Sequence, residues 1–157
     1  VTIEHCRSVR DDAGFCSLAQ STPGQANAGP VTEQAAALTT PLARDARIRA
    51  VVAMAPMAVV LTPESLAAIK LPVKIYVAEK DQVLNGRYHG QFAAQHIPGV
   101  EFVKVAGAGH FAFMSKTTRN VATDAGDPSA DPAGFDRAAY LSQVQEELVD
   151  YFNTQLK

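Results

Sequence analysis

Three short apolar segments, separated by stretches that favour helix, constrain the fold of this chain more than any other feature. The segments are RIRAVVAMAP, VKIYVAEKD and VEFVKVAGAGH, at residues 47–56, 73–81 and 100–110. The first is a continuous apolar run, which is typical of a strand buried on both faces, and Pro72 opens the second, at a position that needs no backbone donor. Because such strands alternate with helices, we expect an α/β fold with a parallel sheet of about three strands flanked by helices.

Helix signals fall between and after these strands. Thr62, Pro63 and Glu64 form a helix start, with an N-cap hydroxyl, a proline at the first helical position and an acid in the first turn. The residues that follow should be helical, as should residues 32–40, 86–99 and a last segment from Asp131–Pro132 onward. That last segment carries an apolar stripe at helical spacing, formed by Tyr140, Leu141, Val144, Leu148, Tyr151 and Phe152. Residues 1–30 are polar and rich in turn formers, and we expect loops at residues 21–30 and 123–134.

Size and charge exclude several classes of function. A chain of 157 residues with a formal charge of −2 fits one domain, and it has no Lys/Arg block to bind nucleic acid. No apolar run approaches the roughly 20 residues that a membrane span needs, and the N-terminus lacks the apolar core of a signal peptide. Three strands make a thin sheet, so we expect them to be part of a larger one, with possible self-association through an exposed sheet edge.

The two cysteines leave the cellular compartment open. Cys6 and Cys16 would pair if the protein is exported or periplasmic, and would be free thiols if it is cytoplasmic. The four histidines show no metal-ligand spacing with these cysteines, so we expect neither a metal nor another cofactor.

Two titratable residues follow consecutive strands and are the candidate catalytic residues. Asp81 ends the second apolar segment and His110 ends the third. Functional side chains of parallel sheets lie just past the carboxyl ends of the strands, so Asp81 and His110 should meet there if the strands are neighbours. A carboxylate that orients an imidazole is two-thirds of a nucleophilic triad. The alternatives are a turn-capping Asp81 and a structural His110, and Glu79 is a rival acid placed two residues earlier.

The segments LPVKIYVAEKDQVL and VEFVKVAGAGHFAFM resemble the C-terminal third of an α/β-hydrolase, nearest to dienelactone-hydrolase-like esterases. The similarity covers roughly residues 45–155. It implies that Asp81 is the acid and His110 the base of a catalytic triad that acts on a carboxylic ester or lactone. Ala78 stands where many members of that family carry glycine. The resemblance also divides the chain into an insertion or lid-like segment at residues 1–45, which Cys6 and Cys16 would pin if oxidised, and the C-terminal part of the hydrolase domain at residues 46–157.

The nucleophile is the main departure from the family pattern. The family uses G-x-S-x-G, placed before the acid, and this motif is absent from the 157 residues. The first explanation is that the serine lies upstream of Val1, so that this chain alone is inactive. The second is that Cys16 is the nucleophile, since GFCSL begins like a G-x-C-x-G elbow, although Leu18 replaces its closing glycine. The third is a non-catalytic binding or interaction module with a hydrolase-like shape. Ser115 is a poor candidate, because it follows His110 closely and lacks elbow glycines.

Overall fold

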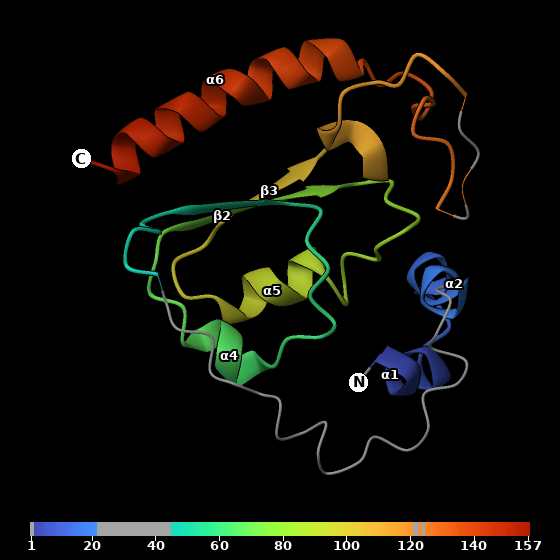
Figure 1. Cartoon of the computed structure of the whole chain (residues 1–157), viewed down its shortest axis with the longest axis horizontal. Helices are drawn as coiled ribbons and strands as arrows, with labels where there is room; N and C mark the ends of the chain where they lie inside the picture. The colour runs from blue at the N-terminus through green and yellow to red at the C-terminus, as the bar shows by residue number, and fades with distance from the viewer. Residues whose placement is uncertain (1, 22–44, 121–122, 124) are drawn as a thin grey trace.

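The three apolar segments form one parallel sheet, as predicted. Its strands are β1 (Val51–Met54), β2 (Val73–Ala78) and β3 (Glu101–Val105), hydrogen-bonded in the order β1-β2-β3. In the register, Met54 lies beside Tyr76 and Ala78 beside Val105, so the carboxyl ends of the strands share one edge. The computed structural model describes residues 2–21, 45–120, 123 and 125–157, and Figure 1 shows their arrangement.

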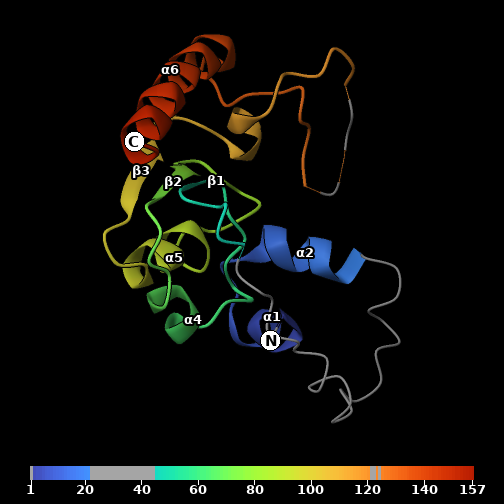
Figure 2. The same ribbon diagram turned by 60° about the vertical axis from the view of Figure 1, so that its left-hand side comes forward.

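Helices cover both faces of the sheet and divide the core in two (Figure 2). On one face, α4 (Pro63–Ala67) and α5 (Gly90–His96) pack on Ile75 and Val77 through Leu66, Ala93 and Ile97. On the other face, α6 (Arg137–Gln155) packs on Tyr76 and Ala78 through Val144 and its neighbours. Residues 75 to 78 thus alternate between the two cores, as the two-residue period of a strand requires. Burying one side chain such as Ile75 stabilises the fold by about 1.5–3 kcal/mol.

The burial of β1 differs from the prediction. We expected this strand to be buried on both faces, but all four of its residues are half-buried. Within the described residues β1 pairs with β2 alone, so it lies at the edge of the sheet. An edge strand lacks a neighbour on one side, and this lowers its burial however apolar its sequence is.

The predicted start of α4 is confirmed, whereas α6 begins several residues later than its sequence indicates. α4 begins as predicted: the Thr62 side chain accepts the Ser65 N–H, the Ser65 side chain accepts the Thr62 N–H, and Pro63 lies in the first turn. The last helix begins later than expected, at Arg137, because Asp136 caps it by accepting the Ala139 N–H. Its predicted stripe does face the sheet, through Tyr140, Leu141, Val144 and Leu148 in the core and the buried Tyr151.

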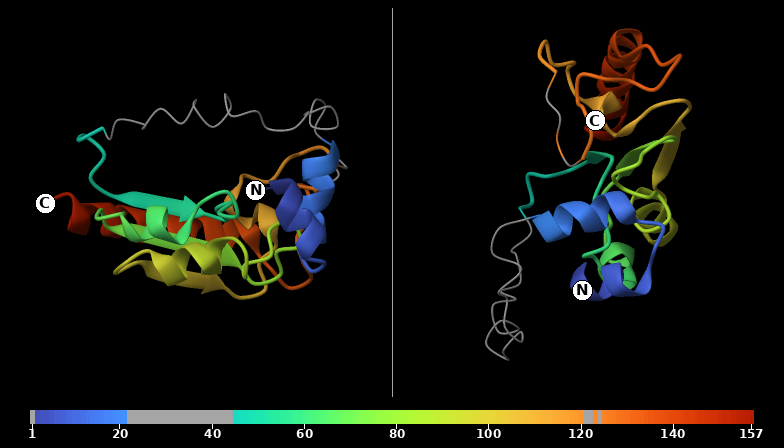
Figure 3. Two further views of the ribbon diagram at one scale, coloured as in Figure 1. Left: turned by 90° about the horizontal axis from the view of Figure 1, so that it is seen from below. Right: turned by 90° about the vertical axis from the view of Figure 1, so that its right-hand side faces the viewer.

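The N-terminal segment contains two helices, although its polar sequence, rich in turn formers, gave no helix signal. They are α1 (Thr2–Ser8) and α2 (Ala13–Ser21), and the disulfide Cys6–Cys16 joins them. We call α1, α2 and the residues between them the N-terminal hairpin. Figures 1 and 3 show it on the side of the sheet toward which the strands point. Of the loop expected at residues 21–30, the first residue, Ser21, ends α2 instead. The rest of that loop and the helix expected at residues 32–40 lie outside the described residues.

Candidate active site

Asp81 and His110 meet at the carboxyl edge of the sheet, as their positions in the sequence predict. Asp81 lies three residues after β2 and His110 five residues after β3, and these two strands are neighbours. The Nδ1 atom of His110 donates to Oδ2 of Asp81 at 2.8 Å. A carboxylate only accepts hydrogen bonds, so Nδ1 carries a proton in this contact, and in the neutral imidazole Nε2 then has the lone pair.

The second oxygen of Asp81 binds the backbone of its own loop. Oδ1 accepts the N–H of Val83 at 2.9 Å and that of Leu84 at 2.8 Å. The carboxylate therefore caps a turn and contacts the histidine at the same time, so turn capping by Asp81 does not prevent its predicted contact with His110. With only 6% of the side chain exposed, these bonds define the orientation of the acid.

The glycines before His110 shape a tight turn. Gly107 has φ +71°, a left-handed conformation that favours glycine, and its N–H donates to Oε2 of Glu79 at 2.9 Å. This hydrogen bond, with Lys104 nearby, lowers the pKa of the Glu79 carboxyl. Glu79, the rival acid, thus supports the turn that leads from β3 into η1 (His110–Phe113).

The outer nitrogen of His110 is available to a reacting group. Nε2 makes no hydrogen bond to any residue that the structure describes, and 22% of the side chain is exposed. The ring lines a pocket of about 300 Å³, together with Phe111 from η1, Lys80 from the turn after β2, and the later residues Asp131 and Pro132. A histidine held by a carboxylate on one nitrogen and open on the other can accept and return a proton at the open atom.

One wall of this pocket is anchored by Arg137. Its buried guanidinium donates to Oδ1 of Asp131 at 2.7 Å, to the carbonyl of Pro128 at 2.7 Å and to that of Ala130 at 2.8 Å. The first residue of α6 therefore holds the preceding loop against the pocket that His110 lines.

A second polar cluster, which sequence reasoning missed, lies beneath the loop of Asp81. Its centre is Asp12, whose side chain is fully buried. Oδ2 of Asp12 lies 2.8 Å from Nε2 of His5 and 2.9 Å from Nε2 of His89, and Oδ1 accepts the Asn85 N–H at 3.1 Å. Because up to 77 residues separate the partners, no local spacing signals the cluster. The closest hint in the sequence was the cysteine pair that pins the hairpin.

His89 is neutral in this cluster. Its Nδ1 accepts the Ala58 N–H at 3.2 Å, so only Nε2 carries a proton, and it donates that proton to Asp12. Burial lowers the pKa of His89, and the nearby Asp12 carboxylate offsets part of this effect. The imidazole thus links the hairpin to the loop that follows β1.

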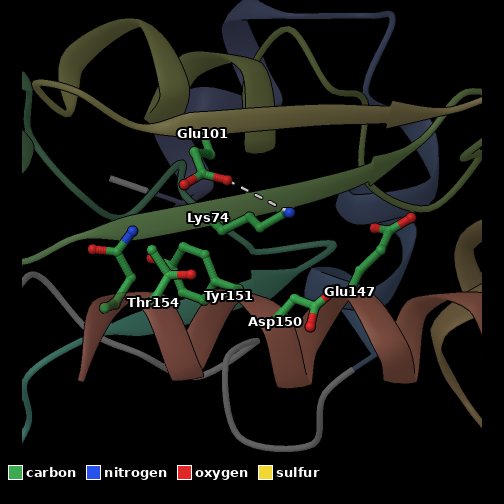
Figure 4. A pocket seen from close by; sticks show the side chains of 7 residues that line it. Lys74, Glu101, Glu147, Asp150, Tyr151 and Thr154 are labelled. Atoms are coloured by element: carbon green, nitrogen blue, oxygen red, sulfur yellow. Dashed lines mark ion pairs between the residues drawn. The ribbon is translucent and has the colours of Figure 1, made fainter. Parts of the chain in front are cut away.

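A third cluster lies at the opposite, amino edge of the sheet and is structural. A pocket of about 290 Å³ lies between α6 and the first residues of β2 and β3. Figure 4 shows the side chains that line it. Lys74 pairs there with Glu101 at 3.5 Å and lies 5.6 Å from the centre of the Tyr151 ring. These contacts join α6 to the sheet, and the pocket lies away from Asp81 and His110.

The two cysteines take on a structural role. Cys16 lies within α2 and is bonded to Cys6, so it presents no thiol, which counts against a cysteine nucleophile. No group of three or more His, Cys, Asp or Glu among the described residues is arranged to hold a metal ion. None of the described helices is both long and apolar enough to cross a bilayer.

Comparisons of the chain with protein-family models, with curated proteins and with solved structures found no match. The assignment of a function therefore rests on the residues of the site themselves.

Proposed function

We propose that Asp81 and His110 are the acid and base of a hydrolase that acts on carboxylic esters or lactones, with a serine nucleophile that precedes this segment. The observation that carries the proposal is the 2.8 Å contact between Oδ2 of Asp81 and Nδ1 of His110 at the carboxyl edge of adjacent parallel strands. The open Nε2 beside a pocket and the resemblance of residues 45–155 to α/β-hydrolases support it further.

In this mechanism the serine hydroxyl attacks the acyl carbonyl while Nε2 of His110 accepts its proton. Asp81 orients the ring through Nδ1 and stabilises the cationic imidazole that forms. Nε2 then returns the proton to the leaving alkoxide as the tetrahedral intermediate collapses to an acyl-enzyme. Water, activated by the same nitrogen, releases the acid and restores the serine. Acid and base without nucleophile and oxyanion donors form no acyl-enzyme, so the 157-residue chain by itself should be inactive.

The proposal is tested on the protein expressed with the sequence that precedes Val1. A G-x-S-x-G motif after an apolar strand in that sequence is the first expected result. A fluorophosphonate probe should then label the longer protein and leave the 157-residue chain unlabelled. His110→Ala should reduce kcat for a short-chain ester roughly 10³-fold or more, as loss of a triad member does.

His96→Ala is the matched control, since His96 lies on α5 and its Nδ1 contacts the carbonyl of Phe92 rather than the candidate site. Near-normal turnover in a folded His110→Ala variant would reject the assignment. A longer protein that folds but neither takes up the probe nor hydrolyses esters would favour the alternative of a binding module.

A further inference from the structure

The N-terminal hairpin packs directly against the loop that carries Asp81. A Cβ atom added to Gly14 of α2 would lie 2.0 Å from the carbonyl oxygen of Gln82 and 2.8 Å from Cα of Val83. No side chain fits at such distances from backbone atoms, so glycine is required for this approach. The contact is made at the residues next to Asp81, one of which donates its N–H to the acid.

Polar contacts tie the rest of the same loop to the hairpin. The side chain of Asn85 donates to the carbonyl of Asp11 at 2.6 Å, and the hydroxyl of Tyr88 donates to Oδ1 of Asp11 at 2.6 Å. Deeper in the interface, Asp12 accepts from the backbone of Asn85 and from the imidazole of His89. The loop from Asp81 to His89 is thus held along its length by two consecutive aspartates.

Of these two aspartates, Asp12 is the buried one, and it binds the backbone of the loop. Its side chain is fully buried, whereas the side chain of Asp11 is exposed and contacts the side chains of Tyr88 and Arg87. Asp12 binds the backbone of Asn85, the residue directly after Leu84, whose N–H holds Asp81. A buried carboxylate that accepts from several donors makes strong, directional hydrogen bonds. Loss of the Asp12 carboxylate should therefore loosen the loop from Asp81 to His89.

We propose that Asp12 is a positioning residue for the candidate active site. Asp12 holds the loop of Asp81 in place. In this position Oδ1 of Asp81 accepts the Val83 and Leu84 amides, and Oδ2 of Asp81 faces His110. The Cys6–Cys16 disulfide keeps α1 and α2 together, so that His5 and Asp12 reach the loop as one unit. Residues 2–21 would then support Asp81, in addition to the lid-like role expected from the sequence.

The test is amide hydrogen exchange of the 157-residue chain, followed by NMR. In Asp12→Asn, the Val83 and Leu84 amides should exchange about 10-fold faster or more, relative to the core amide of Tyr76. The charge-assisted contact of Asp12 with the neighbouring Asn85 amide is lost, so the turn in which Asp81 accepts these two amides should open more often. The low-field proton of His110 Nδ1 should weaken in parallel. Asp11→Asn is the matched control, and there the exchange at Val83 and Leu84 should stay at its wild-type rate.

Unchanged exchange at Val83 and Leu84 in Asp12→Asn would overturn the inference. So would an equal increase at Tyr76, because uniform loss of protection means that Asp12 only stabilises the fold. If Asp12→Asn does not fold, Gly14→Ala replaces it: its methyl group pushes on Gln82 and Val83 and should produce the same selective loss, and a uniform or absent effect there refutes the proposal.

The inference rests on the proposed function only in naming Asp81 a catalytic acid. The exchange experiment needs no nucleophile and reports on geometry alone, while probe labelling of the longer protein reports on chemistry. Failure of one experiment therefore leaves the other result standing.

Discussion

Acidification should destabilise the fold through His89, and the size of the effect follows from its contacts. The folded protein holds this imidazole neutral, because Nδ1 accepts the Ala58 N–H and burial lowers the pKa below its ordinary value of 6.5. The unfolded chain takes up the proton near that ordinary value. Below pH 6.5 the unfolded state thus binds more protons than the folded state, and stability is lost as the pH falls toward the lowered pKa.

For one proton the loss reaches up to about 1.4 kcal/mol at pH 5.5, one unit below the ordinary pKa. The assay is urea denaturation of wild type and His89→Gln between pH 7.5 and 5.5. The variant starts less stable, since it disturbs the contacts with Asp12 and Ala58, but its free energy of unfolding should fall less over this range. His96→Gln is the control, because it removes a histidine of α5 and leaves the Asp12 cluster in place. Equal acid sensitivity in wild type and His89→Gln would refute the reasoning.

Three further predictions concern stability. Reduction of Cys6–Cys16 should add two hydrogens to the intact mass and lower the free energy of unfolding by about 2–4 kcal/mol, and an unchanged mass would show that the bond is absent. Tyr76→Phe removes the hydroxyl that donates to Glu147 at 2.8 Å and should lower stability by about 1 kcal/mol. The same change should let the pKa of Glu147 rise, since the hydrogen bond from Tyr76 is the main cause of its lowered value. An unchanged Glu147 pKa in an NMR titration would show that the Tyr76 hydroxyl does not stabilise this carboxylate. Leu66→Ala, on the buried side of α4, should lower stability by about 2–5 kcal/mol in urea denaturation, and a loss below 1 kcal/mol would mean that Leu66 is not packed in the core as described.

Features encoded by neighbouring residues were predictable from the sequence. The start of α4 follows from Thr62 and Pro63, which act within a single turn. The strands follow from apolar runs, and their parallel order follows from the helices between them. Asp81 and His110 could be paired in advance because each follows a strand, and neighbouring parallel strands end at one edge.

Features that depend on distant packing were not predictable. The cluster of His5, Asp12 and His89 forms only after the hairpin docks on the loop after β2. α1 has seven residues, too few for a stable helix on its own, so its helical state depends on its disulfide and on contacts elsewhere in the fold. The half-burial of β1 depends on its place in the sheet rather than on its composition.

Arg137 has a consequence for redesign of the pocket beside His110. Two of its three acceptors are carbonyls of the main chain, at Pro128 and Ala130, which are present whatever side chains the loop carries. The path of the pocket wall is therefore largely independent of the side chains that line it. Larger or polar residues in place of Ala125 or Ala130, both of which line the pocket, would reshape it without removing an anchor. Under the proposed function, this wall is the place to begin a library of variants that tests substrate preference.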